Sequence, residues 1–299
     1  MAAATGPRVI ATLYPLAFAA ESVAPPGVAV VNLTPAGAEP HDLELAPDDV
    51  RAILGADLVV FVGGFQPAVD RVVAMRDGKS LDVTRISGLR LLEASPDGHQ
   101  PAGAAGPRRA SSLLTPGTAD ERAGGAPLLR ADPHVWLDPR RYRLVARALA
   151  SELGPDADAS AFEARLAELD SEMTRGLSLC GRRELVTSHA AFGYLAERYG
   201  LRQVALAGLD PEAEPGPRDL ERLLFEARRL RATTLFTEPL ARTDVARTLA
   251  RALGARTATL NPMEGLSPRQ AARGEDYFSL MRANLAALRE GLDCPPSSS

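Results

Sequence analysis

Short apolar, β-branched segments alternate with longer stretches of helical character along most of this chain, and this alternation limits the fold more than any other feature. A buried parallel strand gives a short, nearly continuous apolar run, and the helix that returns the chain gives a longer pattern. Apolar runs of this kind lie at 8–12, 28–33, 58–62, 184–188, 203–206, 233–237 and 257–260. The pattern predicts an α/β protein with mainly parallel sheets.

The intervening segments carry the helical pattern. Helix-like stretches lie near 47–55, 67–76, 190–199, 217–230, 242–253 and 274–291. Pro47 and Pro139 stand where a helix begins, and Asp138 is a suitable N-cap for the second of these helices. The first apolar run meets Pro15 early, so we interpret it as a first strand followed by its turn.

Residues 140–179 form a charged helical stretch that is interrupted at Gly154–Pro155. Its second part has one apolar stripe at spacings of three and four, made of Phe162, Leu166, Leu169, Met173 and Leu177. A long helix between two βα halves predicts two lobes joined by a helical spacer. We therefore expect an N-terminal lobe at 7–156, a linking helix at 157–180 and a C-terminal lobe at 181–294. One sheet with a helical insertion is the alternative.

Composition excludes some classes of protein. The chain has 299 residues, 45% of them hydrophobic and 24% charged, with a net charge of −4, which argues against a nucleic-acid partner. Residues 95–131 are rich in Gly, Ala, Pro and Ser and predict a mobile loop. The first residues show no secretory signal, so an exported form would need a targeting segment that this sequence does not show.

The chain has only four histidines, and three of them stand at promising positions. His41 follows a strand and precedes the helix start at Pro47, His134 precedes another helix start, and His189 ends a strand. Ligands of open α/β sheets bind at the carboxyl ends of strands, so these three side chains are expected to converge. Three imidazoles suit zinc above other common divalent ions. His99 lies in the predicted loop and is not expected to join them.

An enzyme is the main competing hypothesis at this stage. A catalytic zinc ion keeps three protein ligands and a water molecule, so ligand count alone leaves a zinc hydrolase open. The sequence lacks H-x-x-x-H, G-x-S-x-G, phosphate-loop and G-x-G-x-x-G motifs, and it offers no evident general base. We therefore predict no catalytic residues and a protein that is not an enzyme.

Six segments, in order, resemble one family: ATLYPLAFAAESVA, GAEPHDLELAPDDVRAILGADLVVFVGG, ADPHVWLDP, ELVTSHAAFGYLAERYGL, GLDPEAEPGP and ATLNPMEGL. They are similar to the zinc-binding solute-binding proteins of ABC importers, over nearly the whole chain. The resemblance implies two α/β lobes joined by a long rigid helix, with zinc held in the cleft between them. It also implies a monomeric receptor outside the cytoplasm, free or lipid-anchored, that delivers Zn²⁺ to an ABC permease with its ATPase. A surface adhesin of the same fold is a further alternative.

The resemblance also implies a ligand set. His41 stands in the P-H-D motif, His134 in the D-P-H-x-W motif, and His189 at the position where zinc receptors carry histidine. Many relatives supply a fourth ligand as an aspartate near the last strand, where this sequence has Asn261. A subgroup with the pattern L-N-P-x-E supplies a glutamate, here Glu264. The alternatives for the fourth position are Glu238 and water, with Glu264 then a solvated loop residue.

Two smaller expectations complete the sequence analysis. Some relatives carry cysteines at the positions of Cys180 and Cys294, which implies a disulfide bond between them. Glu39, Asp42 and Asp132 flank the histidines and are candidates for orienting them, and capping of the local backbone is the alternative role for Asp42.

Overall fold

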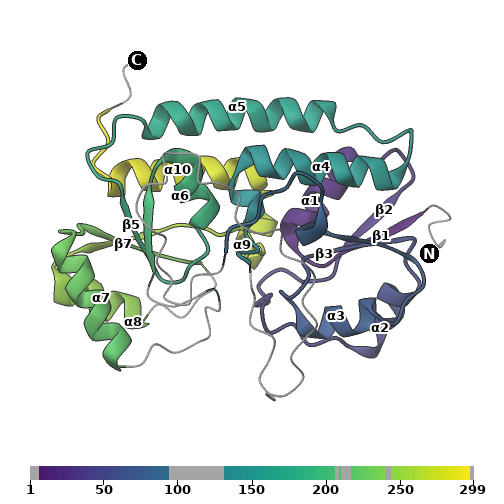
Figure 1. The fold of residues 1–299 in the computed structure, drawn as a ribbon, viewed down its shortest axis with the longest axis horizontal. Helices are drawn as coiled ribbons and strands as arrows, with labels where there is room; N and C mark the ends of the chain where they lie inside the picture. The colour runs from purple at the N-terminus through teal and green to yellow at the C-terminus, as the bar shows by residue number, and fades with distance from the viewer. Residues whose placement is uncertain (1–6, 94–130, 206–208, 210–216, 240–243, 297–299) are drawn as a thin grey trace.

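The computed structural model describes residues 7–93, 131–205, 209, 217–239 and 244–296 (Figure 1). They contain two four-stranded sheets, ordered β2-β1-β3-β4 and β6-β5-β7-β8, and every strand pair is parallel. The strands are β1 (Arg8–Ala11), β2 (Ala29–Asn32), β3 (Leu58–Phe61), β4 (Lys79–Asp82), β5 (Glu184–Thr187), β6 (Arg202–Ala205), β7 (Thr234–Thr237) and β8 (Arg256–Thr259). The prediction of a two-lobed, mainly parallel α/β protein is confirmed, and the single-sheet alternative is wrong.

Helices lie on both sides of the sheets (Figure 1). They are α1 (Tyr14–Val23), α2 (Pro47–Leu54), α3 (Pro67–Val73), α4 (Pro139–Leu153), α5 (Ser160–Leu177), α6 (Gly193–Tyr199), α7 (Pro217–Arg229), α8 (Asp244–Leu253), α9 (Pro268–Ala272) and α10 (Tyr277–Gly291), with short 3-10 turns η1 (Val83–Arg85) and η2 (Val135–Leu137). No helix of the described ranges is both long and apolar enough to cross a membrane.

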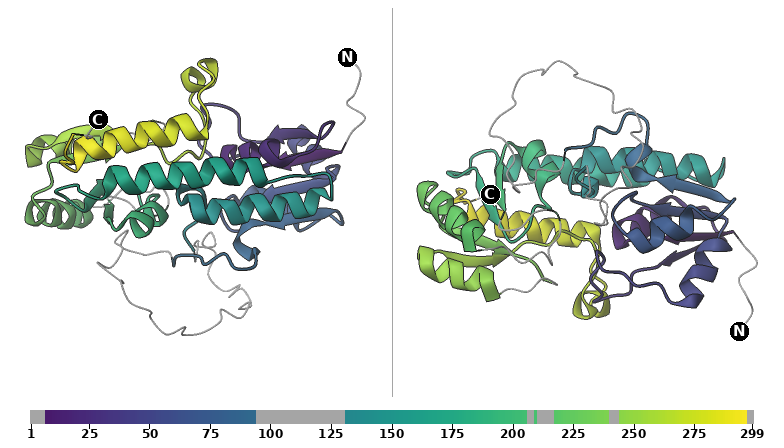
Figure 2. Two further views of the ribbon diagram at one scale, coloured as in Figure 1. Left: turned by 90° about the horizontal axis from the view of Figure 1, so that it is seen from above. Right: turned by 60° about the horizontal axis from the view of Figure 1, so that its bottom comes forward.

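A layer of long helices runs along one side of both sheets (Figures 1 and 2). α5 lies beside α4, and α10, from the end of the chain, packs against α5. A continuous group of aromatic side chains joins α1, α4, α5 and α10, made of Phe18, Tyr142, Phe162, Tyr277 and Phe278. Because this core contains residues from both ends of the sequence, the two halves share an apolar interior and are not joined by the linking helix alone.

The disulfide bond implied by the resemblance is present between Cys180 and Cys294. It ties the residue that follows α5 by a short turn to the chain that leaves α10. The amide of Gly181 donates a hydrogen bond of 3.2 Å to the carbonyl of Asp293, and Arg182 forms an ion pair with the Asp293 side chain at 2.6 Å. Several contacts therefore hold the C-terminal end of α10 to the second half.

The sequence analysis missed three elements. The expected first strand is confirmed as β1, but the turn expected around Pro15 is wrong, because this residue stands in the first turn of α1, where proline is tolerated. α1 is buried on most of its surface, so its sequence lacks the one-sided apolar stripe that marks a surface helix. β4 is a half-exposed edge strand with polar residues, and α9 has only five residues.

Two expectations fall largely or wholly outside the described residues. They are the mobile loop at 95–131, of which only Ala131 is described, and His99. The domain ranges 7–156, 157–180 and 181–294 stay predictions, although α5 lies within the range given for the linking helix.

Candidate metal site

The three predicted histidines meet between the two sheets, as expected from their positions. His41 lies between β2 and α2, His134 immediately precedes η2, and His189 follows β5. Their ring centroids are 5.6–6.3 Å apart. Glu264, from the loop after β8, joins them, and one donor atom from each of the four side chains lies within 4.8 Å of the others.

The carboxylate of Glu264 lies at the centre of this cluster. Its Oε1 atom is 2.6 Å from Nε2 of His134 and 3.5 Å from Nε2 of His189. Its Oε2 atom is 3.5 Å from Nε2 of His41. Because the side chain is only 5% exposed, Glu264 is not a solvated loop residue.

A second carboxylate orients His134 from the other side. Oδ1 of Asp132 lies 2.8 Å from Nδ1 of His134 and accepts a hydrogen bond of 2.9 Å from its backbone amide. A proton on Nδ1 leaves the lone pair of the neutral imidazole on Nε2, which faces the cluster. Both side chains are buried.

Glu238 has the same relation to His189 that Asp132 has to His134. Its Oε1 atom lies 2.5 Å from Nδ1 of His189, on the side of the ring that faces away from Glu264, and also accepts a hydrogen bond from the Ser188 hydroxyl. Glu238 was the alternative fourth ligand in the sequence analysis, and it lies instead behind an imidazole. This geometry suits an orienting role and directs Nε2 of His189 into the cluster.

His41 is held differently, by an aromatic ring and by the backbone. Its ring centroid lies 4.3 Å from that of Phe65. The Gln66 side chain donates a hydrogen bond of 3.0 Å to the carbonyl of Pro40, the residue before His41. Glu39 accepts a weak hydrogen bond of 3.4 Å from the amide of His41. The loop, rather than a carboxylate on Nδ1, therefore fixes this imidazole.

The loop that carries Glu264 is locked in a tight turn. Oδ1 of Asn261 accepts a hydrogen bond of 2.7 Å from the amide of Met263, whose φ of 60° lies in the left-handed region. Asn284 of α10 binds both the amide and the carbonyl of Asn261, at 2.8 and 2.7 Å. The indole of Trp136 donates to the carbonyl of Pro262 at 2.7 Å. Asn261 thus shapes the turn that presents Glu264.

The buried groups strongly alter one another's protonation. Burial lowers the pKa of His134, but hydrogen bonds to Asp132 and Glu264 outweigh it and raise that pKa to about 9. Burial also opposes the charged form of His189, whereas Glu238 and then Glu264 raise its pKa well above the usual value. Burial favours protonation of Glu264, but the three histidines around it hold its pKa well below the usual value. Without a metal, the site therefore holds an anionic Glu264 beside two cationic imidazoles at neutral pH.

This donor set fits zinc. Zinc in a tetrahedral site with bonds of 2.0–2.1 Å separates its ligands by about 3.4 Å. The donor atoms here lie within 4.8 Å of one another, and Glu264 lies 2.6 Å from His134. A contraction of at most about 1.4 Å at the widest pair and a widening at that close contact would complete the coordination. Nε2 of His41 and Nε2 of His189 are buried, and neither has a hydrogen-bond partner in the part of the chain that the structure describes. Two buried ring nitrogens of the candidate ligands are thus left for a cation to bind.

The sequence analysis missed several residues that shape the site. Phe65 and Gln66 carry no motif, although Gln66 directly precedes the helix start at Pro67, a position that often carries a polar side chain. Asn284 and Tyr194 act through contacts more than 20 residues away in sequence, and no local pattern marks them. Only the folded chain brings these residues to the ligands.

Comparison with known proteins identifies the family of the chain. Residues 9–291 match the family described as "ZnuA: Zinc-uptake complex component A periplasmic". The chain belongs to this family. ZnuA-family proteins are solute-binding receptors and do not form an enzyme family.

Individual relatives agree with this assignment. The chain is 30% identical over 298 residues to the high-affinity zinc uptake system protein ZnuA of Bacillus subtilis, covering 95% of this chain and 87% of that protein. It is 32% identical over 292 residues to the zinc-binding protein AdcA of Streptococcus pyogenes, covering 94% of this chain but only 55% of AdcA. The chain therefore spans about half the length of that relative.

A solved structure supports the fold and the kind of site. The Zn(II)-bound ZnuA-like domain of Streptococcus pneumoniae AdcA superimposes with a TM-score of 0.72 at 28% sequence identity. The match covers 96% of this chain and 99% of that domain. The two-lobed fold is thus shared along almost the whole chain with a domain that binds zinc.

Proposed function

We propose that this chain captures one Zn²⁺ ion with His41, His134, His189 and Glu264 and delivers it to an ABC permease with its ATPase. The observation that carries the proposal is the buried cluster of three imidazoles and one carboxylate between two sheets. One anionic ligand offsets part of the charge of the ion, and three neutral imidazoles favour zinc over harder ions. The second half of the chain supplies two of the four ligands, so binding would join the halves.

The ligand set favours a receptor over a zinc hydrolase. A hydrolase keeps one open coordination position for water beside a general base. We propose that the three imidazoles and Glu264 fill all four positions around the ion, and two further buried carboxylates, Asp132 and Glu238, lie against imidazole nitrogens. Membership in a receptor family supports the same choice and also favours it over an adhesin. We therefore propose that the protein has no catalytic activity of its own.

The disulfide bond and the family description support a location outside the cytoplasm. Structural disulfides persist in oxidising compartments, and Cys180 is bonded to Cys294. The family description names the periplasm. We propose that the receptor works there or at the cell surface, as a monomer whose two lobes, 7–156 and 181–294, are spaced by the segment 157–180.

The proposal is tested by comparing two buried glutamates in the metal-stripped protein. Glu264→Gln removes the central negative charge and is expected to weaken zinc binding by about 10-fold or more, which corresponds to about 1.4 kcal/mol. Glu238→Gln is the matched control, since it is equally buried but lies behind His189. It is expected to weaken binding less. Competition with a chromophoric chelator gives both dissociation constants.

Two results would contradict the proposed ligand set. One is a dissociation constant for Glu264→Gln equal to that of the unaltered protein. The other is a calorimetric titration with two equal strong zinc sites per chain. Turnover of ester or peptide substrates by the zinc-loaded protein would contradict the receptor assignment and favour the hydrolase.

A further inference from the structure

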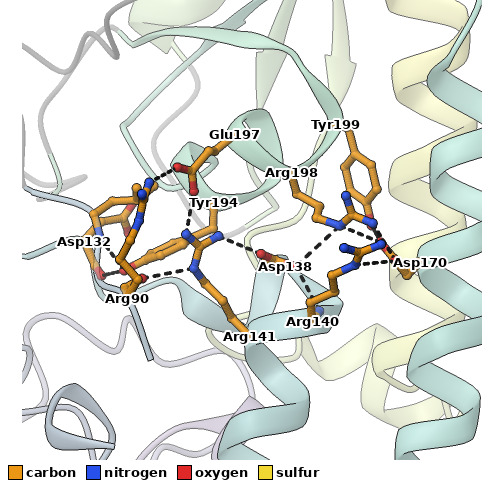
Figure 3. Close-up of polar contacts among 11 residues, drawn as sticks. Arg90, Asp132, Asp138, Arg140, Arg141, Asp170, Tyr194, Glu197, Arg198 and Tyr199 are labelled. Atoms are coloured by element: carbon orange, nitrogen blue, oxygen red, sulfur yellow. Dashed lines mark hydrogen bonds and ion pairs between the residues drawn. The ribbon is translucent and has the colours of Figure 1, made fainter. Parts of the chain in front are cut away.

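Tyr194, in the first turn of α6, makes contacts that reach the opposite side of the metal site. Its side chain is fully buried. Its hydroxyl donates a hydrogen bond of 2.8 Å to the backbone carbonyl of Asp132 and accepts one of 3.0 Å from the amide of Leu92 (Figure 3). One side chain from the second half thus binds two backbone positions that precede α4.

Leu92 and Asp132 are neighbours in space although 40 positions separate them in sequence. The amide of Asp132 donates a hydrogen bond of 2.9 Å to the carbonyl of Leu92, and Glu93 and Ala131 form an antiparallel bridge. The Tyr194 hydroxyl binds both of these paired segments. It therefore fixes their position relative to α6.

Asp132 links this contact to the metal site. Its carboxylate binds the amide and Nδ1 of His134, so the position of its backbone sets the direction of that imidazole. His189 lies five positions before Tyr194, in the turn that leads into α6. The short segment from His189 to Tyr194 thus carries one candidate ligand, His189. Through Tyr194 it also binds Asp132, the residue that orients a second candidate ligand, His134.

The ring of Tyr194 is itself held in place. The guanidinium carbon of Arg141 lies 4.8 Å from its ring centroid. Arg141 also forms ion pairs with Asp138 at 2.7 Å and with Glu197 of α6 at 2.6 Å (Figure 3). A guanidinium that is anchored on both sides keeps the ring, and so the hydroxyl, in one orientation.

We propose that Tyr194 is a positioning residue for the zinc site. It fixes the backbone of Asp132, and through Asp132 the imidazole of His134, in position relative to His189. The inference rests on the proposed function, because it assigns Tyr194 a role in the binding of zinc by those histidines. Removal of the hydroxyl leaves the ligands and the apolar contacts of the ring in place. It detaches the paired Leu92 and Asp132 backbone from α6, so the imidazole of His134 is held less firmly relative to His189.

Tyr199 provides a matched control. It lies at the other end of α6, is also buried, and its hydroxyl donates a hydrogen bond of 3.3 Å to Asp170 of α5. Its contact leads to the helical layer and not to a candidate ligand. Tyr194→Phe and Tyr199→Phe each delete one hydroxyl from the same helix.

The test measures zinc affinity by chelator competition and thermal unfolding of the metal-stripped protein, for the unaltered chain and both variants. We expect Tyr194→Phe to weaken zinc binding by about 5-fold, the effect of one hydrogen bond, and Tyr199→Phe by less than about 2-fold. The visible spectrum of the Co²⁺-loaded protein is expected to change in Tyr194→Phe only, because this spectrum reports the geometry of the ligands. Similar unfolding temperatures for the two variants would separate positioning from a loss of stability.

A double-mutant cycle tests the route through Asp132. Asp132→Ala removes the bonds to His134 but keeps the carbonyl that Tyr194 binds, so in that background Tyr194→Phe is expected to change zinc affinity by less than about 2-fold. Asp132→Asn serves as a second background if the alanine variant does not fold. An equal effect of Tyr194→Phe with and without Asp132 overturns the inference, as does an effect no larger than that of Tyr199→Phe. Failure of the unaltered chain to bind zinc tightly would instead refute the proposed function.

Discussion

The two halves of the chain build the same sheet but supply their metal ligands differently. The strand orders β2-β1-β3-β4 and β6-β5-β7-β8 correspond position by position. In the second half, His189 and Glu264 follow β5 and β8 within a few residues. In the first half, His41 lies nine positions beyond β2, and His134 lies 52 positions beyond β4.

Because of this difference, we expect His189 and Glu264 to be held more rigidly than His41 and His134. The sheet fixes the position of a side chain that comes just after a strand. Glu264 is fixed further by the turn at Asn261, which Asn284 holds. His41 depends on the loop around Pro40, which Gln66 holds. His134, far from the strand that precedes it, depends on hydrogen bonds to Asp132 and Glu264. Identical topology therefore does not give identical rigidity at the strand ends.

The largest expected difference between the halves concerns stability. Both cysteines of the chain belong to the second half or its boundary, and their bond closes a separation of 114 residues. Replacement of both by serine is expected to lower the free energy of unfolding by about 2–5 kcal/mol, measured by denaturant titration. Zinc affinity should change by less than about 2-fold, since none of the ligands contacts the bond.

Hydrogen exchange would show which elements lose stability when the disulfide bond is removed. Protection is expected to decrease first in β5 to β8 and α10, and much less in β1 to β4. A uniform loss over both sheets would show that the halves unfold as one unit and that the shared aromatic core dominates.

The next effect concerns the ligands themselves. His189→Ala is expected to weaken zinc binding by about 100-fold or more, because it removes a ligand and also leaves Glu238 buried without its imidazole. His41→Ala is expected to weaken zinc binding less, since among the described residues no carboxylate binds Nδ1 of its imidazole. Calorimetry on the metal-stripped variants measures both. Equal losses would refute the contrast between a rigid and an adjustable half.

The smallest effect is proton release. The pKa of His134 is about 9 and that of His189 is also raised, so both imidazoles are protonated at pH 7 in the metal-free protein and must lose their protons to bind zinc. About two protons per zinc should appear at pH 7, and the proton from His134 should no longer contribute fully as the pH rises above about 9. Zinc affinity should therefore fall as the pH is lowered.

Calorimetry in buffers of different ionisation enthalpy counts these protons. A count near zero at pH 7 would show that the imidazoles are already neutral and that Asp132, Glu238 and Glu264 do not raise their pKa. His134→Ala and His189→Ala should each reduce the count by about one.

Much of the fold could be predicted because the buried strands are short apolar runs. All strands except β4 were expected within one residue of their observed position, whereas β4 is a polar edge strand that pairs with one neighbour only. α1 was missed because burial on most of its surface removes the periodicity on which prediction depends. Local sequence thus identifies an element that forms a short, bounded apolar run, as β3 does, or a one-sided apolar stripe, as α5 does.

The sequence by itself determined the family resemblance, the parallel α/β halves and the three histidines, because these depend on local patterns and short motifs. The resemblance proposed Glu264 through the L-N-P-x-E pattern and left Glu238 as an alternative, because both follow strands. Only the tertiary structure placed Glu264 at the centre of the cluster and Glu238 behind His189. It also decided which carboxylates raise the pKa of which imidazoles. The physical reason is that coordination and hydrogen bonding depend on distances of 2 to 4 Å between atoms far apart in the chain, and only the packing of the two halves fixes those distances.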